Sequence, residues 1–471
     1  MNYYIGIDLG TSSCKGILTD RTGAVLGEHS VEYPVYSPKP GYSEQDPEEW
    51  FRAAREILSV LSRGREEEIR GIGIAGQMHG LVMLDERDAV IRPAILWNDG
   101  RSAEETAELN ALGTLPTLTG NIAFPGFTAP KILWVRRHEP EHFARVKKIC
   151  LPKDYLAYRL TGVFSTDYSD ASGMLLLDVK NKCWSEEMCR NCGITREMLP
   201  TLYESYDKTG NLKAEFGLPN AVLCAGAGDN AAAAIGTATL REGDCSISLG
   251  TSGTLFLPCD AFYPVGTALH NFAHANGKFH LMGCILSAAS CNKWWVKEIL
   301  QGEYGDPAAP RYGKTGVYFL PYLMGERCPH NDVSARGAFL GLSADTSRED
   351  MSLAVLEGVA YALRDCAEAG GVSPKEAVLC GGGAVSRVWQ RVLSGVLGID
   401  IYLTETEQGP SMGGALLAMA ACGEYENVEA AAENTVKKTL AVRCDPALRE
   451  IYEEGYRVYR QLYPALKGVS F

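Results

Sequence analysis

The sequence predicts a mixed α/β fold built from two similar domains, one in each half of the chain. Residues 9–13 read Leu-Gly-Thr-Ser-Ser, and residues 249–253 repeat them almost unchanged as Leu-Gly-Thr-Ser-Gly. Each copy follows a short run typical of a β-strand, at residues 4–7 and 245–248. Backbone N–H groups and hydroxyls in such a turn can hold phosphate oxygens. Two domains that close on a phosphorylated ligand would explain the repeat; chance similarity between glycine-rich strand ends is the alternative.

The composition is that of an ordinary globular protein with room for two or three domains. Hydrophobic residues make up 46% and charged residues 22% of the 471 positions. The net charge of −13 argues against nucleic acid or an anionic membrane as a partner, because both require clustered Lys and Arg. The 15 scattered cysteines predict reduced thiols in a cytoplasmic protein. We find neither a signal peptide nor an apolar segment long enough to span a bilayer.

Local patterns place the elements of the first half. Several segments have the pattern of strands, and the first three of them form a meander: residues 3–9, 15–20, 24–31, 69–75, 90–97 and 221–225. Asp46 and Pro47 begin a helix that reaches about Ser62, since an acidic N-cap followed by proline favours a helix start. A glycine-rich turn at 226–228 leads into an alanine-rich helix that begins with Asp229.

The domain boundary is predicted at residues 241–244, which gives an N-terminal domain of residues 1–242 and a C-terminal domain of residues 243–471. The second domain should contain a loop, a strand, a glycine turn and a helix: residues 301–314, 378–380, 381–383 and from about 386 onward. The last helix begins at Asp445 and Pro446, and it could pack back on the first domain.

Two segments imitate nucleotide-binding motifs. Residues 71–76 (GIGIAG) match G-x-G-x-x-G, but their glycines alternate with isoleucines as in a strand. Residues 313–315 (GKT) resemble the end of a P-loop, but Ala308 stands where the upstream glycine belongs and no helix-forming run follows. The duplicated turns are therefore the better candidates for phosphate binding.

Three aspartates, Asp8, Asp99 and Asp229, stand at predicted strand ends beside flexible turns. Asp229 lies at a helix start, where the helix dipole favours an ionised carboxylate that could act as a general base toward a hydroxyl. Asp8 precedes the first phosphate turn and is a candidate organiser of Mg²⁺, whereas the second copy has the neutral Ser248 there. Helix capping is the alternative role for any one of these aspartates.

These features resemble the actin-like ATPase superfamily, with its ribonuclease H-like domains, and within it the FGGY carbohydrate kinases. Two stretches are similar to the signatures of that family, at residues 126–134 and 337–357. Further motifs occur in the order typical of the members that phosphorylate a ketopentose: residues 43–47 (SEQDP), 76–80 (GQMHG), 97–101 (WNDGR), 151–155 (LPKDY) and 228–231 (GDNA). Each motif alone is a weak indication, but the ordered set covers nearly the whole chain.

The resemblance implies ATP-dependent phosphorylation of D-xylulose or a close ketose, with Mg²⁺, and it leaves a homodimer open. Asp229 would accept the proton, and Asp8 would assist the metal and the phosphates, so that both carboxylates lie near the ion. Thr11 and a set of second-domain residues would hold ATP: Gly250, Thr251, Ser252, Gly381, Gly382, Gly383 and Ser386. Met78 and His79 would contact the sugar, within a mixed lining that suits a polyol: Trp97, Asn98, Asp99, Asp229 and Asn230. Phosphoryl transfer needs positioning and exclusion of water, so the domains are expected to close.

Five side chains have weaker claims to the site. Trp294 and Trp295 could border the adenine, but packing of a helix is the favoured interpretation. His270 and His274 match none of the motifs and are expected to be structural. Trp97 could equally be an ordinary core residue.

Two other functions stay open. The first is an FGGY kinase for ribulose, gluconate, fuculose or glycerol, although the Gln77-Met78-His79 segment argues against the glycerol branch. The second is a sugar-responsive regulator or an ATPase that transfers no phosphate. Related repressors carry a DNA-binding extension before the first strand, whereas the strand here begins at residue 3 of an acidic chain.

Overall fold

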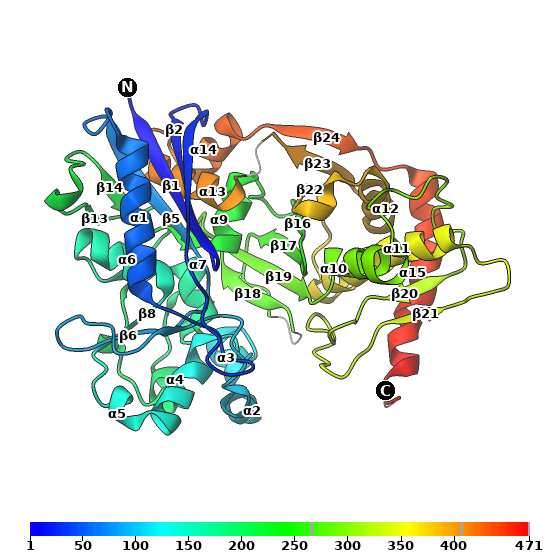
Figure 1. The fold of residues 1–471 in the computed structure, drawn as a ribbon, viewed down its shortest axis with the longest axis horizontal. Coiled ribbons are helices and arrows are strands. Elements are labelled where there is room, and N and C mark those ends of the chain that lie inside the picture. Colours follow the sequence, from blue (N-terminus) through cyan, green and yellow to red (C-terminus); the bar gives the residue numbers. More distant parts are fainter. Residues whose placement is uncertain (265–267, 406–407, 470–471) are drawn as a thin grey trace.

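The computed structural model describes residues 1–264, 268–405 and 408–469, which form two α/β halves lying side by side (Figure 1). Each half is built on a seven-stranded sheet. Within these ranges, no helix is both long and apolar enough to cross a membrane.

The first sheet has the order β13-β14-β5-β1-β2-β3, with β15 also paired to β5. Its strands are β1 (Tyr3–Leu9), β2 (Ser13–Asp20), β3 (Val25–Glu32), β5 (Ile69–Gly76), β13 (Lys208–Asn211), β14 (Val222–Cys224) and β15 (Ala227–Gly228). The predicted meander is confirmed, because β1, β2 and β3 pair antiparallel. β5 then runs parallel to β1, and β14 parallel to β5.

The second sheet repeats this arrangement, in the order β18-β19-β17-β16-β22-β23-β24. Its strands are β16 (Ser246–Leu249), β17 (Gly253–Cys259), β18 (His270–Ala273), β19 (Phe279–Ile285), β22 (Glu376–Cys380), β23 (Asp400–Thr404) and β24 (Lys438–Val442). β16 pairs antiparallel with β17 and parallel with β22, as β1 does with β2 and β5. The two Gly-Thr-Ser turns thus occupy equivalent places, and their likeness is a duplication of topology rather than chance.

Helices cover both sheets (Figure 1). The first half contains α1 (Pro47–Ser62), α2 (Ala103–Ala111), α3 (Leu115–Thr119), α4 (Thr128–His138), α5 (Pro140–Phe143), α6 (Pro152–Thr161), α7 (Tyr168–Ala171), α8 (Glu186–Cys192) and α9 (Asp229–Gly236). The second half of the sequence contains α10 (Ala289–Lys293), α11 (Arg348–Gly370), α12 (Arg387–Leu397), α13 (Gly409–Ala421), α14 (Val428–Thr435) and α15 (Pro446–Leu466). Asp46, Ser386 and Asp445 cap α1, α12 and α15, and the three helices begin where the sequence predicted.

Smaller elements complete the fold. The two-stranded sheets are β4 (Glu44–Gln45) with β7 (Ala94–Ile95), β6 (Val82–Leu84) with β8 (Lys148–Cys150), β9 (Ser165–Asp167) with β12 (Thr201–Tyr203), β10 (Leu177–Asp178) with β11 (Cys183–Trp184), and β20 (Tyr318–Leu320) with β21 (Ala338–Leu340). Short 3₁₀-helices span Ser172–Met174, Arg196–Met198, Ala214–Phe216 and Gly382–Val385, and a π-helix spans Trp294–Ile299.

Two local expectations need correction. The strand predicted over residues 90–97 is wrong, because only β7 forms there; Pro93 lacks the N–H that a continuous ladder needs. The predicted turn at 226–228 is reduced to Gly226, with φ of 74°, since the next two residues form β15. By contrast, the G-x-G-x-x-G imitation at 71–76 does lie inside a strand, β5.

A helix from the second half of the sequence packs on the first sheet. Figure 1 shows α13 among the first-half strands and α15 at the far end of the other half. The approach of α13 is so close that a Cβ on Gly6 of β1 would overlap the carbonyl oxygen of Ser411. The last helix, α15, lies instead against α11 and α12. The helix that packs back on the first half is therefore α13 rather than α15. The division into two domains at residues 242–243 stays a proposal, and α13 follows this boundary in sequence but packs on the sheet of the first half.

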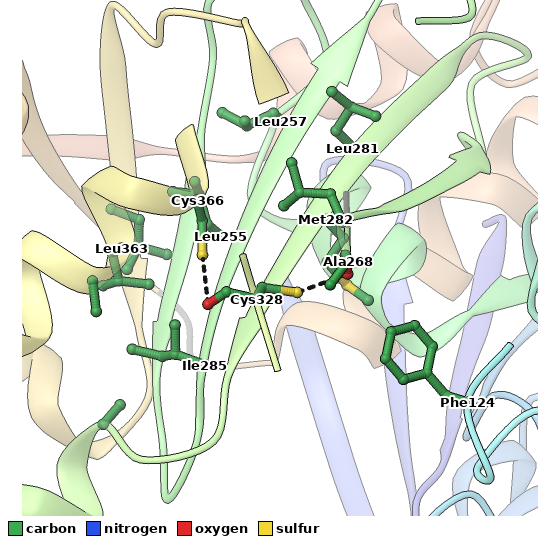
Figure 2. Packing of buried hydrophobic residues seen from close by; sticks show 14 of the residues in the cluster. Phe124, Leu255, Leu257, Ala268, Leu281, Met282, Ile285, Cys328, Leu363 and Cys366 are labelled. Carbon is green, nitrogen blue, oxygen red and sulfur yellow. Dashed lines mark hydrogen bonds between the residues drawn. The ribbon is translucent and has the colours of Figure 1, made fainter. Parts of the chain in front are cut away.

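One hydrophobic cluster continues across both halves. Figure 2 shows Phe124 of the first half at the edge of the second-half core, where Leu255, Leu281 and Met282 of the sheet pack. Asn121 strengthens this contact, because its side chain donates to the carbonyl of Asn271 (3.0 Å) and accepts from the N–H of the same residue (2.8 Å). The sheet edge at β18 therefore docks on the first half.

Candidate active site

The sheet topology brings Asp8 and Asp229 together. Asp8 pairs with Ala75 of β5 on one side, and Gly228, the residue before Asp229, pairs with Gly76 on the other side. Both carboxylates therefore lie at the carboxyl end of the same strand, the usual ligand-binding edge of an open α/β sheet. Burial and the charge of Asp229 raise the pKa of Asp8 to about 7.

Asp229 is the first residue of α9, as the sequence predicted. Burial raises the pKa of its carboxylate to about 6, although Asn230 opposes this shift by donating its backbone N–H (2.7 Å) and its side-chain amide (2.9 Å). An ionised group at neutral pH with a pKa this near to 7 suits a general base.

Two groups of charges near this pair were not predicted from the sequence. Lys15 lies directly opposite Asp8 across the β1–β2 hairpin, and its positive charge partly opposes the rise in the pKa of Asp8. The spacing of Asp8 and Lys15 around a tight turn could have revealed this pairing.

The second group is a buried network that supports the start of α9. The Ser169 hydroxyl accepts from the N–H of Gly228 (3.1 Å) and donates to Asp167.

The network is centred on Lys153. Its ammonium lies 2.8 Å from Asp154 and 3.1 Å from Asp167, and it donates to the carbonyl of Ala225 (3.1 Å). All three charged side chains are buried. Lys153 and Asp154 belong to the LPKDY motif. This motif therefore supplies buried ion pairs beneath the site and does not line it.

His79 has one ring nitrogen that is free to meet a ligand. Its Nδ1 lies 2.8 Å from the carbonyl oxygen of Gly173, so Nδ1 carries the proton and donates it. Burial lowers the pKa of His79 to about 3, so the imidazole is neutral. No described residue bonds Nε2, which is left with a lone pair that can accept from a hydroxyl. The ring stacks on Phe127, with centroids 4.6 Å apart.

Met78 joins this turn to α9, the helix that begins with Asp229. A Cβ on Gly228 would lie 2.9 Å from Cγ of Met78, so the thioether packs against the residue that precedes Asp229. The structure therefore brings together four of the predicted sugar-site residues, Met78, His79, Asp229 and Asn230.

The WNDGR segment behaves differently from the expectation. Trp97 is 41% exposed, and its indole N–H donates to the hydroxyl of Thr11 in the predicted phosphate turn (2.9 Å). Asn98 is exposed. Asp99 is buried and accepts from the N–H of Ser43 (2.6 Å) while it pairs with Arg101 (2.7 Å). These two contacts go to Oδ2, and Oδ1 accepts from the backbone N–H and from Nε of Arg101 (both 2.9 Å), which favours a structural role for Asp99. Its contact with a sugar stays a prediction.

A cavity of about 1000 Å³ lies in the second half, which is large enough for a nucleotide. Predicted nucleotide residues among its lining are Thr251, Gly382, Gly383 and Ser386. Gly250, Ser252 and Gly381 lie in the same two turns without lining the cavity. The carbonyl of Thr251 accepts from the N–H of Ala288 (2.9 Å) and from the hydroxyl of Ser290 (2.7 Å), which ties the second Gly-Thr-Ser turn to the start of α10.

The remaining aromatic candidates are packed in the interior. Trp295 is buried, with its indole N–H donating to Ser352 (2.9 Å), and Trp294 stacks on Phe319. Neither tryptophan lines the cavity. His270 and His274 are also buried, as expected for structural residues.

The second half also places a positive charge, that of Arg327, near His79. The guanidinium of Arg327 lies 5.3 Å from the ring centroid of Phe124, and its charge contributes to the low pKa values of His79 and His270. Sequence reasoning did not find Arg327, because only the docking of β18 on the first half brings it near.

Two similar domains, adjacent carboxylates on one and a nucleotide-sized cavity in the other define a phosphotransferase of the actin-like ATPase fold. The chain belongs to the FGGY family of carbohydrate kinases: the N-terminal domain of the family matches residues 3–236, and the C-terminal domain matches residues 245–422.

Named relatives agree with this assignment. A xylulose kinase from Klebsiella pneumoniae is 44% identical over 89% of this chain and 90% of its own length. A crystal structure of a xyloylose (xylulose) kinase from Brucella ovis covers all of both chains with a TM-score of 0.93 and 39% identity. A gluconate kinase from Lactobacillus acidophilus superposes with a TM-score of 0.94 at 25% identity, over 100% of this chain and 99% of its own. The fold alone therefore does not select the sugar.

Proposed function

We propose that this chain is a xylulose kinase, which transfers the γ-phosphoryl group of ATP to D-xylulose and releases ADP and D-xylulose 5-phosphate. The observation that carries the proposal is the meeting of the Met78-His79 turn with Asp229, beside Asp8. The high identity to named xylulose kinases over nearly the full length supports the choice of sugar.

Asp229 acts as the general base in this proposal. The terminal hydroxyl oxygen of the sugar bonds to the γ-phosphorus, its proton passes to the Asp229 carboxylate, and the bond from phosphorus to the bridging oxygen of ADP breaks. The transition state of such a transfer is loose, so positioning and charge neutralisation matter more than a strong base. A carboxylate whose pKa is about 6 is sufficient.

Asp8 and Asp229 fit the requirements of Mg²⁺ in a kinase. Mg²⁺ is usually held by one or two carboxylates together with waters and substrate phosphates. Among the described residues, no three His, Cys, Asp or Glu side chains gather as a metal site of their own. Asp229 lies close enough to Asp8 to raise its pKa, and a bound cation would offset the repulsion between the two carboxylates. The bound ion would neutralise phosphate charge, and Lys15 adds a positive charge on the same side.

The sugar and the nucleotide occupy different halves in this proposal. His79 accepts a hydroxyl at Nε2, Asn230 offers its amide, and the exposed ring of Trp97 covers the sugar. ATP lies in the cavity beside Thr251 and Gly382, with its phosphates directed at the first half. Closure of the halves would exclude water, which would otherwise hydrolyse ATP.

The proposal extends to location and assembly. All fifteen cysteines are unpaired, which supports a reducing cytoplasm. A homodimer stays a prediction, which light scattering of the purified protein will decide.

A coupled ADP-release assay with D-xylulose, ribulose, gluconate, fuculose and glycerol tests the function. We expect the highest kcat/KM with D-xylulose and little ADP release without sugar. Gluconate is the second candidate, because the positive charge of Arg327 near His79 would suit a carboxylate. A higher kcat/KM with gluconate would overturn the proposed substrate, and sugar-independent ADP release would favour an ATPase.

A further inference from the structure

Lys131 is a fully buried ammonium in α4 whose hydrogen bonds go to backbone carbonyls. Its Nζ donates to the carbonyl oxygen of His79 (3.1 Å) and to that of Ile95 (3.4 Å). Among the described residues, no carboxylate lies within ion-pair distance of this ammonium. Burial lowers the pKa of Lys131 to about 7. Buried lysines are rare unless paired, so such a costly group points to a role beyond packing.

The two carbonyls belong to the two loops of the sugar site. His79 lies in the turn that follows β5, and Ile95 ends β7, which leads directly to Trp97. Thr128, the first residue of α4, donates its hydroxyl to the same His79 carbonyl (3.0 Å). One end of α4 therefore supplies two donors to a single backbone oxygen of the site.

The backbone of His79 needs such support. Its φ of 70° lies in the left-handed region, which non-glycine residues seldom adopt. The imidazole is confined at the same time, because Nδ1 donates to Gly173 and the ring stacks on Phe127. A shift of the His79 backbone would carry the imidazole away from these contacts and turn Nε2 from its present direction.

We propose that Lys131 is a positioning residue of the sugar site. Its ammonium, together with the Thr128 hydroxyl, fixes the carbonyl of His79 and thereby the direction in which Nε2 meets a sugar hydroxyl. The inference deepens the proposed function and rests on it to the extent that His79 binds sugar.

A double-mutant cycle between Lys131 and His79 tests this role. Lys131→Met removes the charge and keeps most of the side chain, and we expect it to raise the KM for sugar by about tenfold or more with the KM for ATP unchanged. In a His79→Ala background the same change should raise the sugar KM by less than about twofold, because no imidazole is left to position. An equal factor in both backgrounds would overturn the inference.

Two further variants keep the test decisive. Lys148→Met is the matched control, since this partly buried lysine of β8 pairs with Asp88, and its sugar KM should stay at the wild-type value. Thr128→Val removes the second donor while it leaves the ammonium in place, and it should raise the sugar KM in the same His79-dependent manner. If Lys131→Met does not fold in a thermal unfolding assay, the Thr128 cycle alone decides. If D-xylulose is not the substrate, the proposed function fails, and both cycles are measured with the sugar that is phosphorylated.

Discussion

Asp8 and Asp229 flank the carboxyl end of β5 from opposite sides, and the charge of Asp229 helps burial to raise the pKa of Asp8 to about 7. The first sheet thus presents two carboxylates that titrate just below or near neutral pH, whereas an ordinary aspartate titrates near pH 4. The duplicated sheet has Ser248 in the place of Asp8, so the second half offers hydrogen bonds there without a carboxylate.

The rate should therefore depend on pH in the mildly acidic range. The proposed base must be ionised, and burial raises the pKa of Asp229 to about 6, so protonation removes the base as pH falls through that value. We expect kcat/KM for the sugar to decline from about pH 7 and to fall roughly tenfold per pH unit below pH 6. A profile measured from pH 5 to 8 at saturating ATP checks this. A rate that stays constant down to pH 5 would contradict the assignment.

Asp229→Asn should fold and lose about 10²- to 10⁴-fold in kcat, the usual contribution of a positioned general base. Stability should be kept or increased at pH 7.5. The folded-state pKa is raised above the unfolded value, so the ionised carboxylate destabilises the fold at every pH above about 6, and the neutral amide removes that effect. Steady-state kinetics and thermal unfolding at pH 7.5 measure both quantities. Near-wild-type turnover in a folded variant would show that Asp229 is only a helix-start residue.

Asp8→Ala should change the Mg²⁺ requirement of the enzyme without changing its affinity for sugar. Asp8 lies on β1 and is expected to act on the metal and the phosphates, so we expect turnover to weaken strongly and to need more Mg²⁺, while sugar affinity measured by calorimetry stays nearly constant. Ser248→Ala, at the equivalent place in the second sheet, is the matched control and should keep the wild-type Mg²⁺ requirement. Lost sugar affinity with an unchanged Mg²⁺ requirement would refute this role of Asp8.

The sequence predicts the features of the fold that depend on residues close together in the chain. The repeated turn, the meander and the helix starts at Asp46, Ser386 and Asp445 each depend on residues close together in the chain, and all are confirmed. The strand over 90–97 was mispredicted, because hydrophobicity outweighed the missing N–H of Pro93.

Long-range relations were beyond the sequence. The return of α13 to the first sheet follows from Gly6 and its neighbours leaving room for a helix, which only a known packing partner reveals. The sequence places Asp99 in a mixed lining that suits a polyol, but it does not reveal that Arg101 and the N–H of Ser43 bind its carboxylate in the fold. Lys131 matters only because α4 folds against the His79 turn.

His79→Ala should raise the KM for D-xylulose by roughly 5- to 150-fold, the range that an unsatisfied buried partner costing about 1–3 kcal/mol implies. The KM for ATP should change little, because the nucleotide cavity lies in the other half. His274→Ala is a useful comparison, since this buried histidine lies outside the site, and any loss of stability there should not change the sugar KM selectively. Equal rises of both KM values for His79→Ala would indicate a folding or closure defect.

The glycine turn after β22 offers two neighbouring substitutions with opposite expectations. Gly381 has φ of 82° and ψ of 169°, a conformation that is essentially restricted to glycine, and a Cβ there would lie 2.9 Å from the carbonyl carbon and oxygen of Leu249. Gly381→Ala should therefore destabilise the protein by about 1–3 kcal/mol and disturb the contact between the two phosphate turns, which raises the KM for ATP more than that for sugar. At Gly382 no heavy atom lies within 4 Å of an added Cβ, so Gly382→Ala should fold with nearly wild-type stability. Chemical denaturation and the two KM values measure these differences. Equal stability of the two variants would show that the Gly381 turn adapts to a side chain, and an unchanged KM for ATP in Gly381→Ala would remove the turn from the nucleotide site.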